Sequence, residues 1–407
     1  ADHYAGSFAD VVRLAVPPRH ATTEKAAQRS WPAPLLDTTP TAGLLSYPDG
    51  PSFLKSLAEA APTRAFWQVA PHFVRDAHGL DDWTRGMVQA TVASLRAGRG
   101  VIIVVPDIRD MVRVRDALGA VIGLGAIAEL HADLGVSARY RNYLAISRGQ
   151  ARVVVGTRAA VYAPVADLGL VCLWDDGDDL HADPRAPYPH TRDVAALRVV
   201  AEQSAMLLAS HGRTAEVQAW ANRGWLGLID LGGGELRRRS PAVRATADSD
   251  FALERDPRAA SSRLPSLAFD TIRTGLASGP VLVQVPRAGY LPVLACQNCR
   301  TRVRCPACHG PVRLRRSRGG RQLDCTWCGR IITDWRCPVC GGGELRAPVV
   351  GSGRTVDELG RAFPGIRVQE SSGERILAAV GEQPALVVCT PGAEPPASHG
   401  YAAAVLL

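Results

Sequence analysis

Eight of the ten cysteines gather in one stretch of the chain, as four Cys-x2-Cys pairs. The pairs are Cys296/Cys299, Cys305/Cys308, Cys325/Cys328 and Cys337/Cys340. Each pair offers two thiolates on a tight turn, and two such turns complete a tetrahedral, all-sulfur zinc site. The chain begins without the basic and apolar pattern of a secretory signal, so clustered pairs predict metal sites rather than disulfides. We therefore expect two Zn²⁺ ions per chain.

The spacing of the pairs restricts how they combine. The two middle pairs are separated by 16 residues, which is typical of a zinc ribbon. Combining them leaves the outer pairs for the other ion; a cross-braced combination also agrees with the spacing. The expected ligands are Cys296, Cys299, Cys337 and Cys340 for zinc 1, and Cys305, Cys308, Cys325 and Cys328 for zinc 2. Four thiolates leave no position for a catalytic water, so both ions would stabilise the fold.

Arginines flank two glycines between the middle pairs. With Gly319 and Gly320 among them, they predict the tip of a basic β-hairpin. Three interpretations are open: contact with DNA phosphate, contact with a partner protein, or a solvated loop. His309 adjoins Cys308 but is expected to be a bystander, because four sulfurs already satisfy each ion. The candidate DNA-binding residues are Arg313, Arg315, Arg316, Arg318 and Arg321.

Short apolar segments alternate with helical ones over the rest of the chain, which predicts an α/β protein. Continuous Val, Ile and Leu runs indicate parallel sheets covered on both faces. Cys172 and Cys389 fall within such runs and are expected to be core thiols. Residues 15–60 and 232–262 have the composition of linkers. The expected strands are 100–106, 152–156, 168–174, 205–209, 280–285, 366–369, 385–389 and 402–407, and the expected helices 8–14, 84–96 and 264–277.

The overall composition is that of a globular protein. At 407 residues, the chain is long enough for two or three domains. Since no apolar run reaches the ~18–20 residues of a membrane helix, we expect a cytoplasmic, nucleoid-associated protein without membrane contact. The net charge of +8 favours a polyanionic partner such as nucleic acid. Arginine usage in a GC-rich genome explains it equally well, because Lys25 and Lys55 are the only lysines.

The cysteine stretch is preceded by Pro286-Arg-Ala-Gly-Tyr-Leu-Pro-Val-Leu-Ala-Cys296, and its last pair is followed by Val350-Gly-Ser-Gly-Arg-Thr-Val-Asp-Glu-Leu. These segments resemble the PriA family, the primosomal helicases of replication restart. Earlier matches occur in the family's order. They are Val104-Val-Pro-Asp, Leu130-His131, Val155-Gly-Thr-Arg-Ala-Ala and Leu168-Gly-Leu-Val-Cys-Leu-Trp-Asp-Asp.

The resemblance implies two RecA-like helicase lobes, with an eight-cysteine double-zinc insertion in the second lobe. It also implies the nested combination of the cysteine pairs. The expected domains are 1–60 as the remnant of an N-terminal or winged-helix region and linker, 61–240 as the first lobe, 241–295 as the start of the second lobe, 296–341 as the zinc insertion, and 342–407 as the continuation of the second lobe.

The ATP-handling motifs of that family are degenerate here. A P-loop needs a Gly-Lys pair, and the chain has none; its expected position, about 71–83, holds one glycine. The acidic box Asp-Glu-Glu-His is replaced by Asp175-Asp176-Gly177-Asp178, and the Ser-Ala-Thr motif by Ser210-His211-Gly212. Gly351-Ser-Gly-Arg-Thr355 imitates a P-loop but is expected to be a turn leading into a helix. Asp175 and Asp176 are the remaining candidates for nucleotide-bound Mg²⁺.

These features lead to three hypotheses. The first is a replication restart protein that binds forked or single-stranded DNA and promotes primosome assembly without helicase activity. Its expected partners are other primosome proteins, the replicative helicase or its loader, and single-stranded DNA-binding protein. The second is an active ATP-dependent 3′–5′ helicase with divergent motifs, and the third a zinc-stapled protein–protein adaptor. The lost motifs argue against an enzyme that uses ATP and Mg²⁺, while the helicase-like fold leaves the question open.

Overall fold

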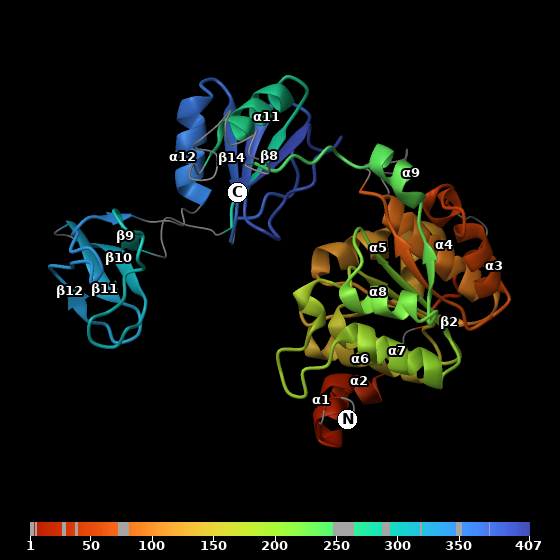
Figure 1. Cartoon of the computed structure of the whole chain (residues 1–407). Helices are drawn as coiled ribbons and strands as arrows, with labels where there is room; N and C mark the ends of the chain where they lie inside the picture. Colours follow the sequence, from red (N-terminus) through yellow and green to blue (C-terminus); the bar gives the residue numbers. More distant parts are fainter. Residues whose placement is uncertain are drawn as a thin grey trace. The chain divides into compact units, whose positions relative to one another are not determined.

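A computed structural model describes residues 4, 6–26, 30–36, 40–71, 81–246, 264–286, 294–317, 320–346, 352–373 and 375–407. The chain folds as two compact units, Ala1–Ala242 and Val243–Leu407 (Figure 1). Each unit contains a parallel sheet, and the second also contains the cysteine pairs. No helix in these described ranges is long and apolar enough to cross a membrane.

The first unit is built on a seven-stranded sheet in the order β3-β4-β2-β5-β6-β1-β7. Its neighbouring strands all run parallel. Its central strands are continuous apolar runs because a parallel sheet is covered on both faces. The strands are β1 (Arg64–Gln68), β2 (Gly100–Val104), β3 (Ile127–Leu130), β4 (Val153–Gly156), β5 (Leu168–Trp174), β6 (Ala205–Ser210) and β7 (Gly227–Ile229).

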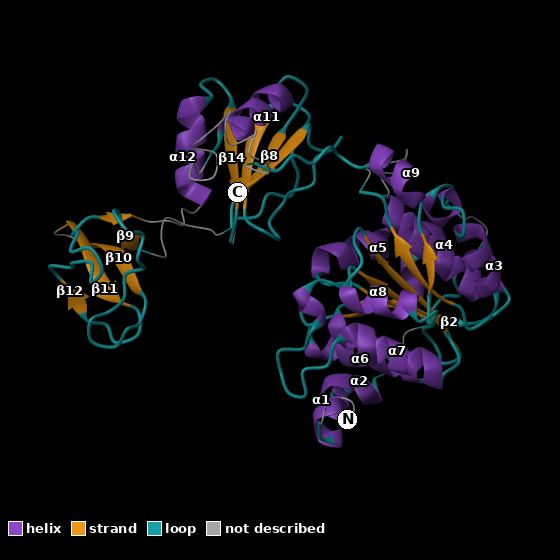
Figure 2. Ribbon diagram, viewed as in Figure 1, coloured by secondary structure: helices purple, strands orange, loops and turns teal. Residues whose placement is uncertain are grey.

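Helices cover both faces of this sheet (Figure 2). One apolar cluster joins α3, α4 and α5 to the sheet, and a second joins α6, α7 and α8 to the opposite face. The Asp107 side chain caps α5 by accepting from the Arg109 and Asp110 amides at 2.8 and 3.0 Å. The helices are α3 (Gly50–Ala58), α4 (Asp82–Arg96), α5 (Ile108–Ile122), α6 (Val136–Ser147), α7 (Thr191–Ala201) and α8 (Ala215–Asn222); short 3₁₀ turns are η3 (Leu124–Ala126), η4 (Arg158–Tyr162) and η5 (Asp179–His181).

Part of the segment expected to be a linker belongs to the core of the first unit. Residues 43–58 form η2 (Gly43–Ser46) and α3, and they bury Leu44 and Tyr47 against the sheet. The expectation was wrong there because the Pro- and Ser-rich composition concealed widely spaced apolar anchors. Likewise, residues 232–239 form helix α9 (Gly232–Arg239) within the second expected linker. Upstream lie α1 (Phe8–Ala15) and α2 (Ala21–Lys25).

The second unit contains a four-stranded parallel sheet in the order β14-β15-β8-β16. An apolar cluster joins α11 and α12 to this sheet. Helix α12 already begins at Ser352, so most of the P-loop imitation is helical rather than a turn. The elements are α11 (Ser266–Leu276), β8 (Val281–Gln284), α12 (Ser352–Ala362), β14 (Arg367–Ser371), β15 (Ala385–Cys389) and β16 (Ala403–Leu406).

Between β8 and α12 the chain forms the cysteine module, residues 294–346. A three-stranded antiparallel sheet and a two-stranded one hold it, in the orders β10-β11-β12 and β13-β9. The expected α/β class, with parallel sheets and a double four-cysteine insertion in the second half, is confirmed. The strands are β9 (Ala295–Cys296), β10 (Val312–Ser317), β11 (Gly320–Cys325), β12 (Ile331–Ile332) and β13 (Leu345–Arg346).

Candidate zinc centres and the edge of the first sheet

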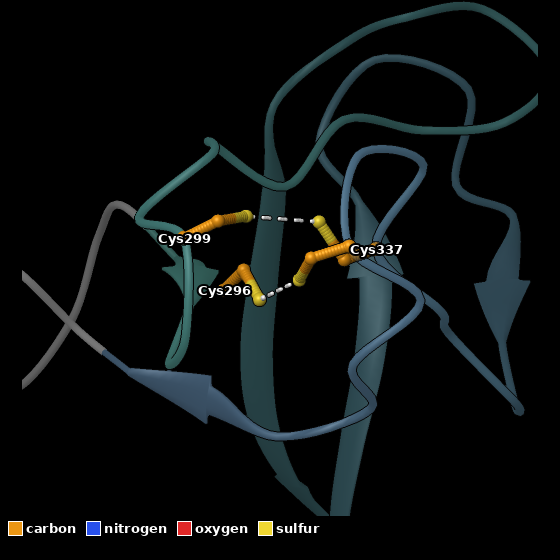
Figure 3. A group of neighbouring side chains, drawn as sticks. Cys296, Cys299 and Cys337 are labelled. Atoms are coloured by element: carbon orange, nitrogen blue, oxygen red, sulfur yellow. Dashed lines mark hydrogen bonds between the residues drawn. The ribbon is translucent and has the colours of Figure 1, made fainter.

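The eight cysteines of the module form two groups of four sulfurs. Within each group every sulfur lies within 4.8 Å of the others. This is the nested combination, with the middle pairs together and the outer pairs together. Figure 3 shows Cys296, Cys299 and Cys337 converging in the outer group. The groups are Cys296, Cys299, Cys337 and Cys340, and Cys305, Cys308, Cys325 and Cys328.

The sulfur separations suit a tetrahedral ion. Cys296 and Cys340 sulfurs are 3.5 Å apart, and Cys299 and Cys337 sulfurs 3.3 Å apart. In the inner group, the Cys305–Cys328 and Cys308–Cys325 separations are 3.8 and 3.4 Å. Zinc–sulfur bonds of about 2.3 Å place tetrahedral sulfurs about 3.8 Å apart. Both groups therefore fit one zinc ion each.

One backbone turn, repeated four times, produces these groups. In every pair, the backbone amide of the residue directly after the second cysteine donates a hydrogen bond to the carbonyl of the first cysteine. The residues that supply this amide adopt positive φ angles of 58–71°. They are Arg300, His309, Gly329 and Gly341, with N–O distances of 3.1, 2.9, 3.1 and 2.9 Å. The sequence analysis missed this role of His309, which is conformational and not that of a ligand.

Hydrogen bonds favour the thiolate at Cys325 and Cys299, whereas hydrogen bonding with the other sulfurs of each group raises the pKa of Cys308 and of Cys340 to about 12. The backbone amide of Cys328 is the main influence that lowers the pKa of Cys325 to about 6. Hydrogen bonding from the Thr301 hydroxyl, 3.2 Å away, lowers the pKa of Cys299 to about 6. Since the thiolate is the form that binds metal, these donors prepare the ligands before an ion arrives.

The module has little else to hold it together. Its apolar core contains seven buried residues, two of which are cysteine ligands. A core of this size rarely supports an independent fold without a metal or disulfides. The buried residues are Leu294, Val303, Cys305, Val312, Leu323, Cys325 and Ile332.

The arginine-rich segment forms the β10–β11 hairpin. Cross-strand register places Arg315 opposite Gln322 and Arg316 opposite Arg321. Arg313 donates from both Nε and Nη2 to Asp324 Oδ2, at 2.9 and 2.8 Å. Arg313 is thus part of an ion pair at the base of the hairpin. The sequence did not reveal that Asp324 is its partner. Arg318 lies outside the described residues.

The net charge of the chain is concentrated in the cysteine module. Residues 294–346 contain eleven arginines and three acidic residues, which leaves 36 basic and 36 acidic residues elsewhere. The formal excess of +8 therefore belongs to the module. Two bound tetrathiolate zinc centres, each carrying about −2, would still leave it near +4. The positive charge of the module is expected to attract a polyanion.

The carboxyl-terminal edge of the first sheet, where a P-loop is expected, presents acidic and aromatic side chains. Residues 72–80 of that stretch lie outside the described residues. Helix α4 follows with Asp81 as its N-cap and Asp82 as its first residue. Asp82 Oδ1 accepts from the Gly43 amide at 3.0 Å, and Asp81 pairs with Arg113. A helix N-terminus attracts anions; here the first two residues of that end are acidic, and the Asp81 side chain makes no capping hydrogen bond.

Aromatic rings fill the adjoining space. Trp83 in the first turn of α4 stacks on Trp174 at the end of β5, with centroids 4.3 Å apart and planes at 14°. Both residues are buried. His211 meets Trp174 edge-on at 5.3 Å, and its Nδ1 lies 3.0 Å from the Val69 carbonyl oxygen. This stack could not be recognised from the sequence.

The two candidate aspartates are engaged with other side chains. Asp175 accepts a hydrogen bond from Ser210 Oγ at 2.9 Å. Asp176 is fully buried, pairs with Arg192 at 2.9 Å and accepts from Thr214 Oγ1 at 2.8 Å. Its carboxylate is thus neutralised by protein, which leaves Asp175 as the more accessible of the pair.

Comparison with known proteins places these features in context. A protein of Mycobacterium bovis named probable replication restart protein PriA is 45% identical over 408 residues, covering all of this chain. The Mycobacterium leprae protein of the same name is 46% identical over 99% of the chain, and the replication restart protein PriA of Bacillus subtilis 26% over 79%. The chain spans 61% of the length of these mycobacterial relatives. No family model matches the chain.

Among solved structures, RecG bound to a three-way DNA junction is similar with a TM-score of 0.32 and 13% identity, over 56% of this chain and 26% of that one. This likeness is too low to support an argument.

Proposed function

We propose that this chain, a relative of mycobacterial PriA replication restart proteins over its full length, takes part in replication restart by binding forked or single-stranded DNA. The relationship at 45% identity carries the proposal. The charge of the cysteine module supports it, because a local excess of arginine is the usual footprint of a surface that binds DNA phosphates. In this role the two lobes and two structural zinc ions serve as a platform on which primosome proteins assemble in the cytoplasm.

We further propose that the chain works without hydrolysing ATP. Asp81 and Asp82 stand where a P-loop helix would receive phosphate, and both are paired with arginines, so this end of the helix offers carboxylates rather than a lysine to a triphosphate. Arg192 neutralises Asp176, which removes a ligand that Mg²⁺ would need. We propose the domains expected from the sequence, a first lobe at 61–240, a second lobe at 241–295 and 342–407, and a zinc insertion at 296–341, with the first lobe extended to include residues 43–58.

Forked DNA tests the DNA-binding proposal. We expect salt-dependent binding of a fluorescent fork in anisotropy titrations, with log Kd linear in log salt concentration. Changing Arg315, Arg316 and Arg318 together to glutamate should weaken binding and flatten that dependence, because phosphate contacts are lost. A matched control reverses the same number of exposed charges on the first unit, at Arg141, Arg148 and Arg223, and should change affinity far less.

The outcomes separate the hypotheses. If the wild-type chain fails to bind forked DNA at low salt, the DNA-binding proposal is wrong and the protein–protein adaptor becomes the better account. If fork-stimulated ATP hydrolysis occurs at helicase-like rates, the ATP-independent proposal is wrong. Equal effects of the hairpin and control variants would remove the hairpin from the binding surface.

A further inference from the structure

One tryptophan of the cysteine module is exposed in a way that packing does not explain. Trp327 lies between the ligands Cys325 and Cys328 and is 69% exposed. The other seven of the chain's eight tryptophans, all within the described residues, are buried or half-buried. An indole is the largest apolar side chain and is usually covered in a folded protein. Its exposure makes Trp327 a candidate contact for a ligand.

The indole is held against a glycine. A Cβ on Gly310 would lie 2.8–2.9 Å from Cδ2, Cε3 and Cγ of Trp327, atoms that span both rings. The neighbouring Thr326 fixes the turn, since its amide and Oγ1 donate to the Pro311 carbonyl at 2.9 and 3.0 Å. One side of the ring thus rests on backbone, and the remainder faces solvent. A ring fixed in this way loses little freedom when a ligand stacks on it.

Two exposed arginines belong to the same pair of cysteine turns as this ring. The exposed Arg304 donates from Nη1 to the His309 carbonyl at 3.4 Å, one residue before the supporting glycine. Arg330, also exposed, follows Trp327 in the same knuckle, where its carbonyl accepts from the Cys325 amide at 2.9 Å. Proteins bind unpaired bases and the adjoining phosphates by combining an exposed aromatic ring with positive charge nearby, and this turn of the module offers both.

We infer that Trp327, supported by Gly310, is a base-stacking platform for single-stranded DNA, and that the exposed Arg304 and Arg330 supply positive charge for the phosphates next to the stacked base. This inference rests on the proposed function and adds its contact with unpaired bases. A neutral or basic peptide partner is disfavoured by charge, because the surrounding module carries eleven arginines against three acidic residues. Duplex DNA cannot use the ring in this way, since its bases are already stacked.

Affinity for single strands tests the platform. The probe is a fluorescein-labelled oligothymidylate, compared with a duplex of equal length, on the zinc-loaded full chain. Trp327→Ala should weaken binding of the single strand by about five- to a hundredfold, the range for losing one stacked base. Trp327→Phe should keep most of the affinity, while Trp327→Leu, which still covers the glycine but cannot stack, should behave like alanine. Duplex affinity and the salt dependence should stay near wild type.

The control variant is Val339→Ala, which removes an equally exposed apolar side chain (70% exposed) from the other zinc group and should leave binding unchanged. Zinc content verifies that each variant is folded, and Trp327→Leu decides the matter if alanine disturbs the module. Unchanged affinity of the leucine variant, or an equal loss in Val339→Ala, would overturn the platform while leaving the proposed function standing. Failure of the wild-type chain to bind any DNA would instead refute the proposed function.

Discussion

The buried pair of Asp176 and Arg192 gives a quantitative prediction. Asp176 is fully buried, and the side chain of Arg192 is 7% exposed, so both charges are largely shielded from water. Oδ2 of Asp176 accepts from Arg192 and Thr214, while Oδ1 has no hydrogen-bond partner within the described part of the chain. Replacing Arg192 with methionine keeps much of the side-chain volume but leaves a buried carboxylate without its cation. We expect a loss of about 3–5 kcal/mol in unfolding free energy.

Urea denaturation followed by tryptophan fluorescence measures this loss, because six of the eight tryptophans lie in the first unit. With an m value of about 3 kcal/mol per molar, the midpoint should fall by roughly 1 M or more. Adding Asp176→Asn to Arg192→Met should recover part of the loss, since the unpaired charge is removed. Thr214→Val removes both a hydrogen bond to this carboxylate, worth about 1.5–3 kcal/mol, and the side-chain cap of α8, worth about 1 kcal/mol.

Two results would refute this reasoning. One is a methionine variant within about 1 kcal/mol of wild type, which would mean that water or another side chain compensates the carboxylate. The other is a double variant no more stable than the single one, because the stability loss would then come from lost packing of Arg192. Either result would also reopen the question of whether Asp176 is available to a metal ion.

Three further predictions follow from the described contacts. Cys305→Ser should lower the zinc content from two ions to one per chain in metal analysis, whereas Cys172→Ser, in a strand of the first sheet, should keep two. A fluorescent ATP analogue with Mg²⁺ should show no saturable binding tighter than about 1 mM, and a tighter Kd would favour the helicase alternative. Gly86→Ala should cost about 1–3 kcal/mol in urea denaturation, because a Cβ there overlaps the buried ring of Trp67; a neutral effect would contradict the packing.

The zinc ligands were accessible from sequence because each knuckle is a local structure of six residues. Spacing alone then favoured the nested grouping without excluding the cross-braced one. The strands at 168–174 and 385–389 were equally accessible, since a continuous apolar run marks a parallel strand covered on both faces.

The edge of the first sheet shows what the sequence could not supply. Trp83 and Trp174 stack across 91 positions of sequence, and only the sheet order brings them together. Asp176 was a reasonable metal-ligand candidate until its contact with Arg192, from another element, was known. Whether a polar residue binds a ligand or stabilises the fold depends on partners that are distant in the sequence, and a local sequence pattern does not identify those partners.

The nested grouping of the cysteines has a consequence for the order in which the two metal ions are taken up. The inner group joins residues 17 apart, Cys308 and Cys325, whereas the outer group joins Cys299 and Cys337, which are 38 apart. Loop-closure entropy favours the shorter loop by about 0.7 kcal/mol, and once it is closed, the path left for the outer group is shorter too. The inner ion should therefore enter first and assist the outer one. In cross-braced sites the two loops would be of nearly equal length, so loop closure would favour neither ion binding first.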